Sequence, residues 1–412
     1  MSADFHVACF HDLRAWGGAL SAARALAAVL RERGWTATRL GVVSGAARRA
    51  SAPLAPDAHN VTLPTPDWRW RFEAWRFPRM LADTLRAIEP PRRAFISLSP
   101  FWILAAKRAW PRTPAVYLFP CLLTNCLPFT WEAPPAFWTR INYAGVRRAE
   151  RLALRRADLT LTATDPGREE ALEFCPLAAP RVRTRPFGYQ IRTRTPEMRA
   201  TARRELGVGD DTFVALACGV LDRNKAFDLL LDEAPLCRGA VHALLVGDGP
   251  RRAALERQAR QRELCGRASL RPAQSDPSIW YAAADCVVST SHYDTCPNAA
   301  LEALGCGLPV VLPRHDPPRV FAGLSPVVER ARAGLCYDRA RRGALAAALD
   351  SLAEDPQDTL RMAARGKALV ERTFRWEDVV HEIVARLALA APCLSAAPPG
   401  ASTPRFQPAR GT

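Results

Sequence analysis

The sequence contains no apolar run that approaches the roughly 20 residues needed to cross a bilayer. The apolar stretch at 96–106 is too short and is closed by Lys107 and Arg108. The first ten residues have no basic segment before a long apolar stretch, so we expect no signal peptide. These absences predict a cytoplasmic protein.

Cysteine pairs at metal-binding spacing are also missing, because none of the 12 cysteines belongs to a Cys-x-x-Cys motif. Many of them, such as Cys9, Cys218 and Cys286, lie inside apolar runs. In a cytoplasmic protein such residues are mostly small buried hydrophobic side chains. We expect neither a zinc site nor a disulfide framework.

Lysine is scarce, so arginine supplies nearly all of the positive charge behind a formal net charge of +16. One interpretation is a generally basic surface that reflects composition. Another is an anionic partner, either the inner face of the plasma membrane or an anionic glycan acceptor. The chain carries no nucleic-acid recognition motif, so we expect no nucleic acid as a partner.

Residues 67–80 alternate tryptophan and phenylalanine with arginine. Aromatic rings and basic groups both gain at a membrane interface, so this segment predicts peripheral contact with lipid. The alternative is a surface helix whose aromatic side chains belong to the core.

What the chain does contain is enough apolar material for two or three globular domains, because 49% of its 412 residues are hydrophobic. A strand at 5–10, a helix at 19–33 and a strand at 36–43 form a βαβ opening, which predicts a parallel sheet. Gly17 and Gly18 lie at the strand-to-helix turn, where a ligand can approach the backbone. A tight turn without a ligand is the alternative.

Basic residues follow a strand in the second half of the chain. The strand at 213–218 leads into Gly219, and Arg223 and Lys225 come shortly after it. On a loop above the carboxyl edge of a sheet, the arginine fork and the lysine charge suit a pyrophosphate.

Residues 289–313 hold the strongest single motif. A polar loop ends at Pro297, a short helix is predicted at 298–304, and two acids, Asp294 and Glu302, frame its start. The free N–H groups and the dipole of a helix N-terminus favour a phosphate. The pattern therefore predicts a nucleotide-sugar site, with phosphates at the helix start and acids on the hydroxyl groups.

The order of these motifs resembles family 4 of the GT-B glycosyltransferases (group 1 glycosyltransferases). The matching segments are GVLDRNKAFDLLL (219–231), LLVGDGPRR (244–252), WYAAADCVVSTS (280–291) and DTCPNAALEALGCGLPVV (294–311), the last similar to the acid-x7-acid motif of the family.

This resemblance implies an α/β protein with the GT-B fold, in which two Rossmann-like, doubly wound parallel-sheet domains face a cleft. We expect an acceptor-binding domain at 1–188, a linker at 189–201 and a nucleotide-sugar-binding domain at 202–375. A helix at 376–390 would cross back to the first domain. The proline-rich residues 391–412 predict a disordered tail.

The resemblance also implies roles for individual residues. Lys225 would hold the donor pyrophosphate and Glu302 the ribose hydroxyl groups. Asp294 and the backbone from Thr295 through Cys296 and Pro297 to Asn298 would face the transferred sugar and the phosphates. The remaining substrate-binding residues would be glycines or lie near the base or a phosphate: Gly17, Gly18, Gly219, Gly247, Arg271, Pro272 and Ser291.

Three positions depart from the family pattern. Val220 replaces an arginine, so either Arg223 substitutes for it or one phosphate contact is missing. Asp294 is one methylene shorter than the usual glutamate. An acceptor-side histidine is replaced by Pro120-Cys121, and we consider His11 as its substitute or as an ordinary loop histidine.

The resemblance implies a metal-independent, retaining transferase of the hexosyl type, with Lys225, Arg223, Asp294 and His11 as catalytic residues. A sugar would pass from a nucleotide-sugar donor to a cell-surface glycan or glycolipid, in lipopolysaccharide or polysaccharide biosynthesis. The donor is a substrate, and no cofactor is expected. The alternative is an inactive GT-B scaffold that binds nucleotide sugar as a partner subunit.

Overall fold

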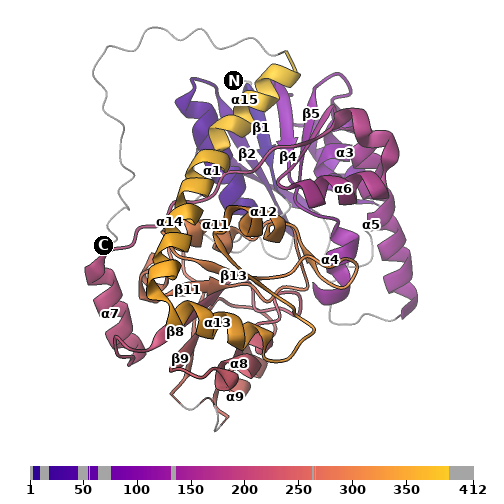
Figure 1. The fold of residues 1–412 in the computed structure, drawn as a ribbon. Coiled ribbons are helices and arrows are strands. Elements are labelled where there is room, and N and C mark those ends of the chain that lie inside the picture. Colours follow the sequence, from indigo (N-terminus) through magenta and orange to yellow (C-terminus); the bar gives the residue numbers. More distant parts are fainter. Residues whose placement is uncertain are drawn as a thin grey trace, which may run out of the picture.

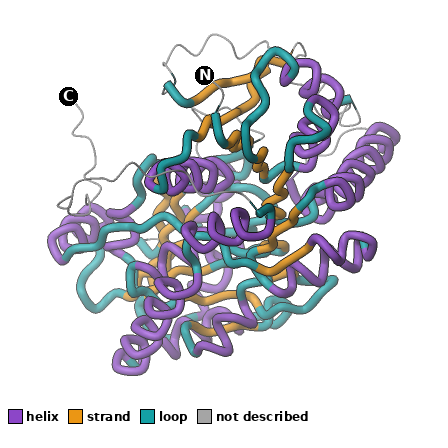
Figure 2. Tube along the Cα trace, turned by 90° about the horizontal axis from the view of Figure 1, so that it is seen from above, coloured by secondary structure: helices purple, strands orange, loops and turns teal. Residues whose placement is uncertain are grey.

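The computed structural model describes residues 3–9, 18–44, 54, 56–63, 76–130, 136–261, 264 and 266–388. His11, Gly17, most of the tryptophan–arginine segment and the predicted tail lie outside these residues. The described chain forms two parallel β-sheets, each with helices around it (Figures 1 and 2).

The first sheet has seven parallel strands in the order β3-β2-β1-β4-β5-β6-β7. Its strands are β1 (Phe5–Ala8), β2 (Ala37–Ser44), β3 (Ala58–Leu63), β4 (Ala94–Ser97), β5 (Ala115–Phe119), β6 (Leu159–Thr162) and β7 (Val182–Thr184). Its helices are α1 (Gly18–Glu32), α2 (Phe77–Leu85), α3 (Pro100–Ala109), α4 (Leu123–Thr130), α5 (Ala136–Arg156) and α6 (Asp165–Phe174).

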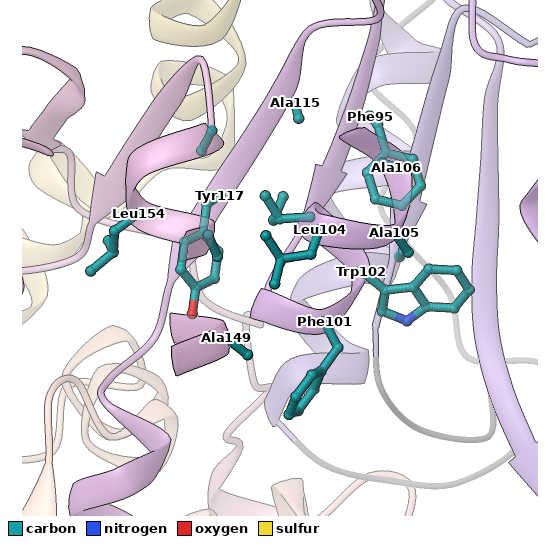
Figure 3. Close-up of a cluster of buried hydrophobic side chains, with 14 of the residues drawn as sticks. Phe95, Phe101, Trp102, Leu104, Ala105, Ala106, Ala115, Tyr117, Ala149 and Leu154 are labelled. Atoms are coloured by element: carbon teal, nitrogen blue, oxygen red, sulfur yellow. The ribbon is translucent and has the colours of Figure 1, made fainter. Parts of the chain in front are cut away.

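Both faces of this sheet are buried. Phe95 of β4 and Tyr117 of β5 belong to one apolar cluster, whereas their neighbours Ile96 and Val116 belong to another on the opposite face. Figure 3 shows the first cluster, where Trp102 of α3 packs near Phe95. Because successive strand residues point to opposite faces, only a sheet covered on both sides buries such continuous apolar runs.

The second sheet has six strands in the order β10-β9-β8-β11-β13-β15, all parallel. Its strands are β8 (Phe213–Cys218), β9 (Val241–Val246), β10 (Ala268–Arg271), β11 (Cys286–Val288), β13 (Val310–Pro313) and β15 (Gly334–Tyr337). A separate two-stranded pair joins β12 (Tyr293–Asp294) to β14 (Phe321–Ala322).

Helices accompany this second sheet along the chain. They are α7 (Pro196–Leu206), α8 (Asp228–Glu233), α9 (Arg252–Ala259), α10 (Ser278–Ala283), α11 (Asn298–Gly305), α12 (Ser325–Ala331), α13 (Ala344–Glu354) and α14 (Pro356–Thr373). The strand order is that of a Rossmann fold, in which ligands bind beyond the carboxyl ends of the strands. The predicted α/β class with two doubly wound domains is confirmed.

The carboxyl edges of the two sheets face each other. Gly18, which begins α1, lies against Asn298, which begins α11: a Cβ added to Gly18 would lie 2.5 Å from the Asn298 Nδ2 atom. A Cβ added to Gly167 at the start of α6 would lie 2.8 Å from the Thr295 Cγ2 atom. Loops that follow strands of both sheets therefore meet at one interface.

The chain crosses between the domains at two adjacent points. The final helix, α15 (Trp376–Arg386), buries Trp376, Val379 and Ile383 in the core of the first domain. In Figure 1 it lies beside α1, whereas α14 lies on the second domain. The Trp376 ring stacks on Phe187, with centroids 6.0 Å apart.

The predicted domain limits remain predictions, but two segments are placed by the structure. The last residues of the predicted linker, 196–201, are helical, because Thr195 caps α7 and Pro196 occupies its first turn. Of the predicted membrane-docking segment, Phe77 is described and is buried in the core against Phe101, which agrees with the alternative interpretation for that residue.

Replacing Gly188 with valine is expected to lower the free energy of unfolding by about 2 kcal/mol, because the new side chain overpacks this crossing. A Cβ at Gly188 would lie 2.6 Å from the Trp376 backbone nitrogen, which cannot rotate away. Urea denaturation followed by tryptophan fluorescence measures the loss. Gly239→Ala is the control, because a Cβ there meets no atom within 4 Å. An equal loss in both variants would contradict the prediction.

Candidate functional site

The loop after β8 is fixed by its own side chains. The Asp222 carboxylate accepts the Lys225 N–H at 2.8 Å, which closes a turn. The Asn224 side chain donates to the Tyr293 carbonyl at 2.9 Å and accepts the Tyr293 N–H at 3.0 Å. Asn224 thus pins the loop to β12, the strand that ends in Asp294.

Lys225 and Asp294 form an ion pair inside this arrangement, with Nζ and Oδ2 2.5 Å apart. Burial alone would lower the pKa of Lys225, but the charge of Asp294 outweighs it and raises that pKa. The amine is therefore charged near neutral pH. Its side chain remains 25% exposed, so a ligand can reach it.

Helix α11 begins four residues after Asp294, and Pro297 at its capping position makes no side-chain hydrogen bond to the helix. The Thr295 side chain is buried, and its hydroxyl has no hydrogen-bond partner among the described residues. Ser291, Asp294 and Pro297 line one small cavity. The cationic turn and the helix start, predicted to grip one diphosphate, therefore lie side by side.

Glu302 is positioned by partners that the sequence did not predict. Its carboxylate accepts two hydrogen bonds from Arg192, at 2.9 and 3.0 Å, and one from the Tyr281 hydroxyl at 2.9 Å. The residue is only 7% exposed. Its role in binding a ribose stays a prediction. Arg192 contacts the same carboxylate oxygens that would accept the ribose hydroxyl groups.

The structure places the residues of the predicted phosphate loop after β8. Gly219 follows β8, and its N–H donates to the Val246 carbonyl at 2.9 Å, which brings it beside Gly247. Arg223 is exposed and has no ion-pair partner in the described part of the chain, so its guanidinium is open to an anion. Val220 is 51% exposed and supplies no charge.

The predicted base contacts are less accessible. The Arg271 guanidinium stacks over the Trp280 ring at 5.3 Å, and its Nη2 donates to the Glu205 carbonyl at 3.1 Å. Pro272, next in the chain, is exposed. Burial raises the pKa of Cys296, so that residue contributes a neutral thiol or its backbone.

A second set of contacts joins the domains beside the ion pair. The Tyr293 hydroxyl donates to the Glu170 carboxylate of α6 at 2.5 Å and accepts the Leu122 N–H at 3.0 Å. Asn125 of α4 also donates to Glu170, at 2.7 Å. The residue before Asp294 therefore anchors the second domain on the first.

The first residues of helix α4 donate hydrogen bonds to a second buried acid, Glu150. The Glu150 carboxylate accepts the Leu123 N–H and, at 2.8 Å, the Thr124 hydroxyl. Cys121 occupies the position of the expected histidine. Its Sγ atom lies 3.5 Å from the Sγ atom of Cys126. This hydrogen bond and burial raise the pKa of Cys121, so it stays protonated and is no general base.

Two predicted site residues of the first domain, His11 and Gly17, lie outside the described residues, and only Gly18 of the glycine pair is described. In the described chain no group of three or more histidine, cysteine or acidic side chains could hold a metal ion, and no helix has the length and apolar character to cross a membrane.

The arrangement can bind an extended anion with adjoining hydroxyl groups. Charged Lys225, open Arg223 and the α11 N-terminus supply positive potential at one place. Glu302 supplies acceptors for hydroxyl groups about one helical turn away. Sequence reasoning missed Asn224, Tyr293 and Arg192, because none of them belongs to a periodic or spaced pattern.

Comparison with solved structures identifies the fold. Sucrose-phosphate synthase from Thermosynechococcus elongatus superposes with a TM-score of 0.76 at 19% identity, covering 93% of this chain and 98% of that chain. WaaG, a glycosyltransferase involved in lipopolysaccharide biosynthesis, gives 0.71 at 14% identity, covering 92% and 99%. HepE from Anabaena, in complex with UDP-glucose, gives 0.71 at 20% identity, covering 93% and 99%. At these identities the likeness defines the GT-B fold.

Sequence comparison identifies the family. Residues 212–355 match the family model described as glycosyl transferases group 1. This match confirms the predicted resemblance to the group 1 glycosyltransferases for residues 212–355.

Two curated relatives show the range of the family. A GDP-mannose-dependent alpha-(1-6)-phosphatidylinositol dimannoside mannosyltransferase from Mycobacterium tuberculosis is 30% identical over 56% of this chain and 57% of its own length. A D-inositol 3-phosphate glycosyltransferase from Pseudarthrobacter chlorophenolicus is 30% identical over 48% and 47%. The chain thus spans about half the length of the curated relatives it matches.

Glu150 predicts a specific dependence of stability on pH. Burial raises its pKa from 4.5 to about 7, against the opposing effect of its hydrogen bonds. The native state therefore holds the proton more tightly than the unfolded state. This contribution is complete below about pH 4.5 and is lost as pH rises through about 7, by at most about 3 kcal/mol.

Glu150→Gln should flatten this dependence, because glutamine does not titrate. Urea midpoints measured at about pH 5 and about pH 8 should lie closer together than in the wild type. Glu354→Gln, a change at an exposed acid, should keep the wild-type difference. An unchanged difference in Glu150→Gln would show that this carboxyl is not the source.

Proposed function

We propose that this protein is a retaining, metal-independent glycosyltransferase that moves a sugar from a nucleotide-sugar donor to a cell-surface glycan or glycolipid. The observation that carries the proposal is the ion pair of Lys225 with Asp294 beside the α11 N-terminus, inside the segment that matches the family. The UDP-glucose complex of a structural neighbour supports a nucleotide-sugar donor.

The reaction breaks the bond between the sugar and the nucleotide diphosphate while an acceptor hydroxyl attacks from the same face. Negative charge develops on the leaving phosphate, and Lys225, Arg223 and the α11 N–H groups would stabilise it. Charge stabilisation of this kind is commonly a large catalytic contribution. Asp294 would orient Lys225 and face the transferred sugar, while Glu302 would bind the ribose.

The acceptor proposal rests on the relatives. One relative is by name a phosphatidylinositol dimannoside mannosyltransferase, and WaaG is involved in lipopolysaccharide biosynthesis. We therefore propose a glycolipid acceptor, in lipopolysaccharide or polysaccharide biosynthesis. The acceptor would approach from the first domain, where Gly18, Leu122 and Gly167 face Asn298, Tyr293 and Thr295 in that order.

Peripheral contact with an anionic membrane at the inner face of the plasma membrane is supported by α5. The only acid of this helix, Glu150, is buried, whereas its arginines are exposed. The exposed arginines of α5 are Arg140, Arg147, Arg148, Arg151, Arg155 and Arg156. A helix face with one sign of charge is attracted to anionic lipid, and salt weakens that attraction.

Lys225→Met should reduce turnover by roughly 100-fold, because a charge that stabilises the leaving phosphate is removed. Release of nucleotide diphosphate from a panel of nucleotide sugars, with and without a glycolipid acceptor, measures it. The control is Lys367→Met, a lysine that pairs with Glu371 on the exposed side of α14. Equal turnover in wild type and Lys225→Met would remove the site assignment. Donor binding without turnover on any acceptor would favour the inactive scaffold.

Replacing Arg148 and Arg155 together with serine should weaken binding to phosphatidylglycerol vesicles by roughly tenfold or more at low salt, because two charges leave the surface. Co-sedimentation at low and high salt, with phosphatidylcholine vesicles for comparison, measures it. The matched variant replaces Arg341 and Arg342, an exposed pair in the second domain. Equal effects of both double variants would contradict a role for α5.

A further inference from the structure

Arg192 lies between the domains, outside every matched motif, yet its side chain ends on the acid of the candidate donor site. Its Nε donates to Glu302 Oε2 at 2.9 Å and its Nη2 donates to Oε1 at 3.0 Å. The two side chains are 7% and 9% exposed. With the Tyr281 hydroxyl, three donors hold a carboxylate that can accept about four hydrogen bonds.

The linker that carries Arg192 is packed on the helix that carries Glu302. A Cβ at Gly305 of α11 would lie 2.8 Å from the Tyr189 hydroxyl, so the tyrosine ring covers the end of that helix. The Cys306 thiol donates to the Arg192 carbonyl at 3.5 Å. Arg192 therefore belongs to a segment that is packed on α11. Its backbone carbonyl and its guanidinium both have hydrogen-bond partners there.

Arg192 also touches the loop expected near the base. Its Nη1 lies 3.4 Å from Asp276 Oδ1, and Asp276 accepts the Ser278 N–H at 3.1 Å at the start of α10. This loop begins at Pro272. Arg192 thus connects the residue expected to bind the ribose with the segment expected beside the base.

Packing alone does not account for this pair. Desolvation of two buried charges largely offsets their attraction, so an apolar pair of similar volume would stabilise the domain equally well. An oriented carboxylate such as that of Glu302 is useful where its remaining lone pairs can accept hydrogen bonds from a polar ligand. The pair lies at the carboxyl edge of the sheet, where ligands of this fold bind.

We propose that Arg192 is a positioning residue for the donor: it orients the Glu302 carboxylate, so that the acceptor site left open takes a hydroxyl group of the donor ribose. This inference rests on the proposed function. Without Arg192 the carboxylate would lose two of its three hydrogen-bond donors and would no longer be held in one orientation. Donor binding would then weaken.

The test is calorimetric titration of the full chain with nucleoside diphosphates. Arg192→Met should weaken binding by about tenfold or more, with partial recovery in Arg192→Lys. KM for the donor should rise while kcat changes less. Arg194→Met is the matched control, because Arg194 is on the same segment but donates to the Ala284 carbonyl rather than to an acid.

The outcomes separate the two proposals. If the wild type binds no nucleoside diphosphate, the proposed function fails. If the wild type binds and Arg192→Met binds as tightly or more tightly, only the role of Arg192 is overturned. An equal loss in Arg194→Met would also overturn it. If Arg192→Met does not fold, Tyr281→Phe removes one donor from Glu302 and keeps its charge partner, and unchanged binding in that variant and in Arg192→Lys would refute the role.

Discussion

Two side chains next to each other in the loop after β8 hold the site together. Asn224 bonds both backbone groups of Tyr293, and Lys225 pairs with Asp294. Strand β12, which contains Tyr293 and Asp294, has only two residues, and so short a strand cannot fix its own position. The placement of α11, and with it the predicted phosphate site, depends on these contacts.

The same short strand also connects the domains. Tyr293 faces Glu170 of the first domain while its neighbour Asp294 faces Lys225 of the second. A displacement of the first domain therefore acts on a residue bonded directly to the ion-paired acid. Glu302, in contrast, is held by Arg192 from the segment that joins the two domains. Both predicted acids of the donor site are thus supported by residues at the domain boundary.

Elements that bury a continuous apolar face could be predicted from the sequence. The strand at 213–218 matches β8 residue for residue, and the helix at 298–304 differs from α11 by one residue. Local signals suffice there, because strand runs and a proline at a helix start act within a few residues. The pairing of Lys225 with Asp294 was not foreseen, although both residues were singled out.

What could not be predicted depends on contacts between distant residues. Strand β12 was expected to be part of a polar loop, because its partner β14 lies almost thirty residues further along the chain. Arg192 stands in a stretch rich in arginine, threonine and proline, and nothing local distinguishes it from Arg194. Its contact with Glu302 forms only because α11, 110 residues away, lies beside it.

The stack of Phe187 on Trp376 has a consequence for the motion of the molecule. The two chain segments that connect the domains contact each other at this place. Gly188 leaves no room for a side chain there. Helices α4 and α6 lie on the opposite side of Figure 1 from α15. Any separation of the domains would therefore turn about this point. It would also have to break the hydrogen bond between Tyr293 and Glu170, which joins the domains away from the pivot.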